Sequence, residues 1–242
     1  MTGLQRQPAV VFFDFNYTLA DFVRPMRHYE AIAEWLRKPP GEVASVLRRY
    51  EERYETGLYP EIRMRKVLQR LGIRLDLDPD LIRKLIRLEQ RRCLGAMELY
   101  PGALDLLDWL RSRQIKIILV CNGNPNTKFI VERLGVLDRC NHTVFSCDSE
   151  VRSQKPNAPI YRRAMGLARV PEAAGLYVGD GGNCELGGLH RVYPGIPRVR
   201  VDHPIDGRRR DPGDPRLELG SEFVIPHIAD LRGLFSPVAS PT

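Results

Sequence analysis

The sequence lacks any apolar run that approaches the roughly 18 residues needed to cross a bilayer as a helix. Its longest apolar runs are Ala9–Phe13 and Ile117–Cys121. The first run ends at Asp14 and is too short to be the apolar region of a secretory signal peptide. We therefore expect a soluble, cytoplasmic protein that does not contact a membrane.

Cysteine is scarce and scattered. The 242 residues include five cysteines, and no two of them form a Cys-x-x-Cys pair. A small zinc module needs closely spaced thiolates, and a disulfide framework needs an even set of cysteines. The pattern argues against both, so the fold must depend on an apolar core, for which 43% hydrophobic residues are sufficient.

Lysine is also scarce, although the chain is basic. Of its 37 cationic side chains 31 are arginine and 6 are lysine, and the 30 acidic side chains leave a net charge of +7. Nucleic-acid-binding proteins concentrate such charge in a patch or stripe. Here the arginines alternate with acids, and even the cluster Arg208–Arg210 lies between Asp206 and Asp211. We expect no nucleic-acid partner.

Most of the chain alternates between strand and helix patterns. Ala9–Phe13 is typical of a strand that is buried on both faces. After Pro101 the pattern predicts strands at Ile115–Cys121, Thr143–Ser146, Leu176–Val178, Arg198–Val201 and Glu222–Ile225, and helices at Gly102–Arg113, Thr127–Leu134, Ala158–Leu167, Cys184–Arg191 and Ile228–Phe235. This alternation predicts an α/β fold with a doubly wound, parallel, Rossmann-like sheet.

Residues 21–95 interrupt the alternation. Apolar residues recur there at helical spacing, and proline and glycine divide the segment into about four helices with no strand pattern. The sequence therefore predicts an inserted all-helical domain at 21–95 and an α/β core domain at 1–20 and 96–242. Trp35, Tyr50 and Tyr54 are predicted in the core of the insert, and arginines such as Arg63 mostly on solvated helix faces.

Polar groups follow three of the predicted strands. Asp14 ends the first, Cys121–Gly123 the second and Asp180 a later one, while Lys155 precedes a proline between the last two. Ligands of open α/β sheets bind at the carboxyl ends of the strands. Each of these groups is a weak signal alone, but their order along an alternating chain predicts one site.

Four segments, in this order, resemble the motifs of the haloacid dehalogenase (HAD) superfamily. They are Phe12–Leu19, Leu119–Gly123, Lys155-Pro156 and Val178–Glu185. The resemblance covers nearly the whole chain. The helical insert between the first and second motifs is similar to the cap of the superfamily's phosphatase branch. The resemblance therefore implies a phosphatase that acts on a small phosphorylated metabolite.

The resemblance also implies a nucleophile and a metal site. Asp14 would attack phosphorus and form an aspartyl-phosphate. Both reactants are anions, so Mg²⁺ is expected as the cofactor, held by hard oxygen ligands. Its implied ligands are Asp14, the backbone carbonyl of Asn16, Asp180 and Glu185, the last of which could instead orient metal-bound water.

A phosphoryl-binding set is implied as well. Lys155 would act in catalysis and in substrate binding by offsetting negative charge at the site. The other implied substrate-binding residues are Cys121, Asn122 and Gly123, and the backbone amides around the last two would cradle phosphoryl oxygens.

Two residues depart from the superfamily pattern. Asn16 stands where its phosphatases usually have an aspartate that acts as general acid and base, and loss of that help costs about a hundred- to ten-thousand-fold in rate. Cys121 replaces a serine or threonine, and a thiol is a weaker hydrogen-bond donor than a hydroxyl. A catalytic thiolate at Cys121 is disfavoured because Asp14 and Asp180 are expected nearby.

Three functions are compatible with these residues. The first is a magnesium-dependent phosphatase that is weak or limited to good leaving groups. The second is a non-catalytic protein that binds a phosphorylated ligand or a protein partner, which Asn16 and Cys121 would favour. The third is a dehalogenase, which uses the same nucleophile without a metal, but Asp180 and Glu185 argue against it.

Overall fold

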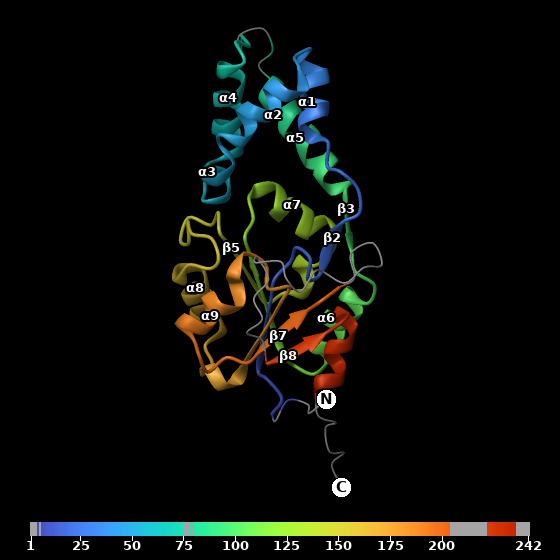
Figure 1. Cartoon of the computed structure of the whole chain (residues 1–242), viewed down its shortest axis with the longest axis vertical. Helices are drawn as coiled ribbons and strands as arrows, with labels where there is room; N and C mark the ends of the chain where they lie inside the picture. The colour runs from blue at the N-terminus through green and yellow to red at the C-terminus, as the bar shows by residue number, and fades with distance from the viewer. Residues whose placement is uncertain (1–3, 5, 75–77, 79, 204–221, 236–242) are drawn as a thin grey trace.

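The computed structural model describes the chain except for residues 1–3, 5, 75–77, 79, 204–221 and 236–242. Its centre is a six-stranded sheet of order β5-β4-β1-β6-β7-β8, in which every pair of neighbours is parallel (Figure 1). The strands are β1 (Val10–Phe13), β4 (Lys116–Cys121), β5 (His142–Phe145), β6 (Gly175–Gly179), β7 (Arg198–Val201) and β8 (Phe223–Ile225). This confirms the predicted α/β class with a Rossmann-like sheet. The cluster Arg208–Arg210 lies outside the described residues.

The central strand β1 contributes to an apolar core on each face of the sheet. Val11 and Phe13 belong to one core cluster, and Val10 and Phe12 belong to the other. Successive side chains of a strand point to opposite faces, so a strand that is covered on both sides must be continuously apolar. This is why the uninterrupted apolar run identified β1 in the sequence.

Helices cover both faces of the sheet. In Figure 1, α8 (Ala158–Ala168) and α9 (Glu185–Val192) lie on one side, and α6 (Ala103–Ser112) lies on the other with the 3₁₀ helix Ile228–Leu234. The last of these segments was predicted as a helix over Ile228–Phe235, and the structure has a 3₁₀ helix that ends one residue earlier. No helix in the described ranges is long and apolar enough to cross a membrane.

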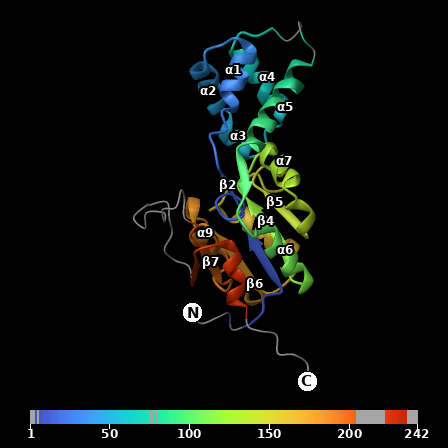
Figure 2. The same ribbon diagram turned by 90° about the vertical axis from the view of Figure 1, so that its right-hand side faces the viewer.

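The inserted helices stand over one end of the sheet, above α7 (Pro125–Arg133), as both views show (Figures 1 and 2). They are α1 (His28–Leu36), α2 (Pro40–Arg48), α3 (Glu51–Glu55), α4 (Pro60–Arg70) and α5 (Leu81–Leu94). The expected count was about four, and the difference is the short α3, which a turn at Tyr50 separates from α2. We call α1–α5 the cap.

A short antiparallel ribbon joins the cap to the rest of the chain. Strand β2 (Ala20–Phe22) pairs with β3 (Met97–Leu99), and Phe22 lies opposite Met97. The prediction that residues from 21 onward contain no strand was therefore wrong at its first two positions. The pairing partner of β2 lies beyond the whole cap in the sequence, so no local pattern marked this strand.

The interior of the cap departs from expectation at two residues. Tyr50 and Tyr54 are buried as predicted, but Trp35 is 49% exposed. Arg63 is only 1% exposed, whereas solvated helix faces were predicted for most cap arginines. Its Nη1 lies 2.8 Å from a carboxylate oxygen of Glu89, and its guanidinium stacks over the Tyr54 ring at 4.2 Å. A buried charge requires such partners, so Arg63 is a structural residue of the cap.

Candidate active site

The three predicted acidic ligands meet at one edge of the sheet. Asp14 follows β1 and Asp180 follows the neighbouring strand β6, and the amide of Asp14 donates to the Val178 carbonyl at 2.9 Å. Glu185 begins α9, and all three carboxylates are buried. One carboxylate oxygen from each lies within 4.8 Å of the others. Adjacent parallel strands thus place the carboxylates where the sequence predicted them.

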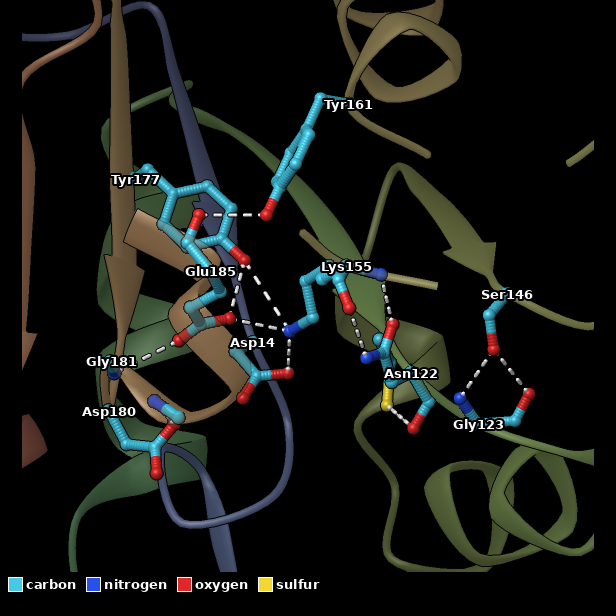
Figure 3. Close-up of polar contacts among 12 residues, drawn as sticks. Asp14, Asn122, Gly123, Ser146, Lys155, Tyr161, Tyr177, Asp180, Gly181 and Glu185 are labelled. Atoms are coloured by element: carbon cyan, nitrogen blue, oxygen red, sulfur yellow. Dashed lines mark hydrogen bonds and ion pairs between the residues drawn. The ribbon is translucent and has the colours of Figure 1, made fainter. Parts of the chain in front are cut away.

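Lys155 lies among these carboxylates (Figure 3). Its Nζ is 2.5 Å from Asp14 Oδ1 and 2.6 Å from Glu185 Oε2, and the side chain is buried. Burial alone would lower the pKa of Lys155, but Asp14 and Glu185 outweigh it and raise that pKa well above its usual value. Lys155 is therefore a permanent positive charge in contact with the predicted nucleophile.

The three carboxylates, if all were ionised, would carry more negative charge than Lys155 offsets. Burial raises the pKa of Asp14, and Asp180 raises it further against the opposing effect of Lys155. Burial and the charge of Asp14 likewise raise the pKa of Glu185 to about 8. When all three acids are ionised, the cluster with Lys155 has a net charge of −2. Hard carboxylate oxygens with this excess charge are compatible with a divalent cation.

The carboxylate of Glu185 is held by donors on both of its oxygens. Oε1 accepts from the Gly181 amide at 3.2 Å, and Oε2 accepts from Lys155 and, at 2.9 Å, from the Tyr177 hydroxyl (Figure 3). The Tyr161 hydroxyl donates to the Glu185 backbone carbonyl at 2.7 Å. Neither tyrosine was identified from the sequence, because Tyr177 lies in an apolar strand and Tyr161 in a helix, where each looks like an ordinary core aromatic. This arrangement makes Glu185 a fixed partner of Lys155.

Glycines make room for the acidic residues. A Cβ atom on Gly179 would lie 2.0 Å from Glu185 Oε1, so a larger residue there would displace the carboxylate. Gly181 has φ +81°, which L side chains rarely adopt, and the Gly182 amide donates to Asp180 Oδ1 at 3.0 Å. The glycine-rich turn after β6 therefore fixes the positions of Asp180 and Glu185.

The loop after β4 makes hydrogen bonds to two other segments of the chain. The Asn122 side chain binds the backbone of Lys155 at two points, accepting from its amide at 2.6 Å and donating to its carbonyl at 3.1 Å. The Gly123 amide donates to Ser146 Oγ at 3.0 Å. The hydrogen of the Gly123 amide thus has an acceptor in this structure, and the role of that amide in cradling a phosphoryl oxygen stays a prediction. Ser146 was not singled out in the sequence.

Cys121 is the last residue of β4 and is fully buried. Its Sγ lies 3.4 Å from the Asn122 carbonyl oxygen. Burial, followed by the charge of Asp14, raises the pKa of Cys121 well above its usual value. The thiol therefore stays protonated at neutral pH, in agreement with the expectation that no catalytic thiolate forms there.

The loop after Asp14 contains two polar atoms that lack a protein partner among the described residues. They are Asn16 Oδ1 and Thr18 Oγ1, and both atoms are buried. Buried polar atoms in folded proteins nearly always have a hydrogen-bond partner. Two such atoms within four residues of Asp14 are compatible with a polar ligand at this site. Metal binding by the Asn16 carbonyl stays a prediction.

Comparisons with known proteins identify relatives of this fold. The family model for haloacid dehalogenase-like hydrolases matches residues 8–192. No curated protein matches the sequence. The solved structure of L-2-haloacid dehalogenase from Xanthobacter autotrophicus has 21% sequence identity and a TM-score of 0.61, over 94% of this chain and 98% of that protein.

Two further solved structures are similar over nearly their whole length. The 2-haloacid dehalogenase from Pseudomonas syringae pv. tomato DC3000 has 19% identity and a TM-score of 0.69, over 93% of this chain and 96% of that one. The HAD phosphatase from Thermococcus onnurineus has 20% identity and a TM-score of 0.57, with the same coverage of 93% and 96%. At these identities the likeness shows the fold, which dehalogenases and phosphatases share.

Proposed function

Because the chain belongs to the haloacid dehalogenase-like hydrolase family, we propose that it is a magnesium-dependent phosphatase of a small phosphorylated metabolite. The observation that carries this proposal is the buried cluster of Asp14, Asp180 and Glu185 around Lys155. A cluster with excess negative charge suits a divalent cation, and a cation is what an anionic phosphate needs in order to approach an anionic nucleophile.

Asp14 acts as the nucleophile in this proposal. Its carboxylate oxygen forms a bond to phosphorus while the bond from phosphorus to the leaving oxygen breaks, which produces an aspartyl-phosphate. Water then cleaves the acyl-phosphate, releases inorganic phosphate and regenerates Asp14. Lys155, whose Nζ is 2.5 Å from Asp14 Oδ1, orients the carboxylate and offsets charge on the phosphoryl oxygens.

The metal site is assigned to oxygen atoms around Asp14. Asp14, Asp180 and the Asn16 backbone carbonyl would hold Mg²⁺, which supplies positive charge to the phosphoryl group when bound. Glu185 was included among the predicted ligands. Its two oxygens already accept from Gly181, Lys155 and Tyr177, so we assign it chiefly to orienting Lys155.

Asn16 limits the leaving groups that such a site can expel. An amide cannot protonate a departing alkoxide or accept a proton from the attacking water. Acyl and aryl phosphates have weakly basic leaving groups, which depart without protonation. We therefore propose that the preferred substrates carry a leaving group of this kind.

Dehalogenation is a second candidate because a halide also leaves without a proton, which suits Asn16. However, Asp14, Asp180 and Glu185 would repel the carboxylate of a haloacid. One experiment separates the candidates: phosphate release from p-nitrophenyl phosphate, acetyl phosphate and a panel of sugar phosphates, and chloride release from 2-chloropropionate, each with Mg²⁺ or EDTA.

We expect phosphate release that requires Mg²⁺, that Asp14→Asn abolishes, and that Asp180→Ala reduces by at least about a hundredfold. Asp108→Asn is the matched control, since Asp108 is half-exposed and pairs with Arg139 on the outer surface. Phosphate release by wild type no faster than by Asp14→Asn would contradict the phosphatase. Chloride release would identify a dehalogenase, and magnesium-dependent binding of phosphate without turnover would identify a binding protein.

A further inference from the structure

A short helix of the cap, α3, contacts the segment that follows Cys121–Gly123. The Asn124 side-chain amide donates to Glu51 Oε1 at 3.2 Å, and the Tyr54 hydroxyl donates to Asn126 Oδ1 at 3.3 Å. Asn124 is the N-cap residue of α7 and accepts from two amides of the first turn. The cap is thus bonded directly to the turn that begins α7.

The end of α3 contacts two more segments of the site. The Ser146 hydroxyl lies 2.7 Å from the Glu55 backbone carbonyl, and Ser146 follows β5. The Gln154 side chain donates to the Glu55 carboxylate, and Gln154 directly precedes Lys155. One five-residue helix therefore contacts the segments after β4, after β5 and before Lys155.

Ser146 is the junction between α3 and the loop after β4. Its backbone is fixed, because its amide donates to the Cys121 carbonyl at 3.0 Å and its carbonyl accepts from the Ser153 amide at 3.2 Å. Its hydroxyl accepts from the Gly123 amide at 3.0 Å and is fully buried (Figure 3). The Glu55 carbonyl at 2.7 Å is a nearer acceptor for its single proton than the Gly123 carbonyl at 3.2 Å.

We propose that Ser146 is a positioning residue that couples docking of α3 to the geometry of the loop after β4, whose residues Asn122 and Gly123 are predicted to bind the phosphoryl group. When α3 is docked, the hydroxyl proton points to Glu55, which leaves a lone pair for the Gly123 amide. When α3 moves away, that proton can turn only to the Gly123 carbonyl, so the hydroxyl rotates and its contact with the Gly123 amide no longer has a fixed direction. The neighbouring Asn122 holds the backbone of Lys155 at two points, so the effect reaches the charge beside Asp14.

The identity of the ligand rests on the proposed phosphatase function, whereas the coupling between α3 and the loop does not. Ser146→Ala removes the hydroxyl without adding atoms to a buried site. We expect it to weaken binding of inorganic phosphate, measured calorimetrically with Mg²⁺, by about tenfold, which is the scale of one buried hydrogen bond. The KM for p-nitrophenyl phosphate should rise by a similar factor, while kcat changes less than about threefold.

Ser112→Ala is the matched control. Its hydroxyl also donates to a backbone carbonyl, that of Trp109 at 2.8 Å, but on the exposed face of α6. Tyr54→Phe is the second variant, since it removes only the hydroxyl that contacts Asn126. Ser146→Ala and Tyr54→Phe both act through docking of α3. The fold-loss of phosphate affinity in the double variant should therefore be smaller than the product of the two single fold-losses. Multiplicative effects would mean that Ser146 has a merely structural role.

Hydrogen exchange tests the coupling without any ligand. Ser146→Ala should speed exchange in α3, and Tyr54→Phe should speed it at residues 122–124, whereas Ser112→Ala should change neither. If wild type binds no phosphate but exchange is coupled, the proposed function is wrong and the positioning role holds. If exchange in each segment is insensitive to the change in the other, the positioning role is wrong. It is also wrong if wild type binds phosphate and Ser146→Ala binds it equally tightly.

Discussion

In the proposed mechanism, Asn16 is the residue that most restricts the chemistry of the site. It lies two positions after Asp14, and its side-chain oxygen is buried without a partner among the residues that the structure describes. An amide at this point keeps the backbone carbonyl for a metal but transfers no proton. The side-chain oxygen of Asn16 is therefore buried near Asp14, but it does not provide the acid–base function that a carboxylate would.

Asn16→Asp should restore part of that function. The two side chains are nearly isosteric, so the change fits without repacking, and Lys155 with Mg²⁺ offsets part of the added charge. Because p-nitrophenolate leaves without a proton, the gain should come from the second step, where the carboxylate accepts a proton from the water that attacks the aspartyl-phosphate. We expect p-nitrophenyl phosphate hydrolysis to be at least about tenfold faster, the low end of general acid–base contributions. Asp14→Asn in the same background should remove the gain. An unchanged initial rate in a folded, magnesium-bound variant would argue against phosphate hydrolysis.

Glu185 gives the metal-free protein a pH-dependent stability. Its pKa is about 8 in the folded protein against a usual value of 4.5. The folded state therefore binds more protons than the unfolded state between these values, and stability must fall as pH rises from about 5 to 8. Glu185→Gln, which does not ionise, should show a smaller fall.

The measurement is thermal unfolding in EDTA at several pH values, repeated with excess Mg²⁺. Mg²⁺ favours the ionised carboxylates and should reduce the fall in the wild-type protein. Equal pH slopes for wild type and Glu185→Gln in EDTA would show that Glu185 does not titrate in this range.

At the scale of elements, contact between α9 and the segment around Lys155 keeps the site together. Gly188 of α9 lies against Pro156, and a Cβ atom at Gly188 would be 2.5 Å from Pro156 Cβ and 2.7 Å from its carbonyl oxygen. Glu185 begins the same helix, and Lys155 precedes Pro156. The absence of a side chain at Gly188 therefore lets these two elements approach closely enough for their ion pair.

Gly188→Ala should push α9 away from Pro156. The clash involves backbone atoms, so we expect a loss of about 1–3 kcal/mol in unfolding free energy, measured by urea denaturation. Gly166→Ala is the matched control, because Gly166 also lies in a helix but has nothing within 4 Å of the added carbon. It should be neutral or stabilising. Equal effects of the two changes would contradict close packing at Gly188.

For the whole molecule, the main question is how far the cap is independent of the α/β core. The chain enters and leaves the cap through β2 and β3, which pair side by side. The cap has an apolar cluster of its own, which includes Leu47, Val67 and Leu85. The division at residues 21 and 95 stays a prediction, because Cys93 belongs to the core cluster of the sheet.

Replacing residues 24–95 with a short Gly-Ser linker tests this independence. The ends are adjacent, so the linker needs only a few residues, and both apolar cores of the sheet remain nearly complete. We expect a cooperatively folded α/β protein by circular dichroism that still binds Mg²⁺ but binds phosphate more weakly. A protein that does not fold cooperatively would show that the cap is part of the same unit.

The sequence by itself determined the α/β class and which residues could form the site. Period-two and helical patterns are local, and parallel strands bring their carboxyl ends to one edge. Asp14, Lys155 and Asp180 could therefore be predicted to meet although they are far apart in the chain. In the structure, Lys155 Nζ lies 2.5 Å from Asp14 Oδ1 at this edge of the sheet.

Only the tertiary structure decided which partners these residues take. Three contacts join segments that share no sequence pattern. They are the hydrogen bond from the Tyr177 hydroxyl to Glu185, the hydrogen bond from the Gly123 amide to the Ser146 hydroxyl, and the buried ion pair of Arg63 with Glu89. A tyrosine in a strand or an arginine in a helix has the same local signature whether it is solvated or buried. Its role depends on which atoms face it after folding, because the cost of burying a polar group is offset only by a partner at hydrogen-bond distance.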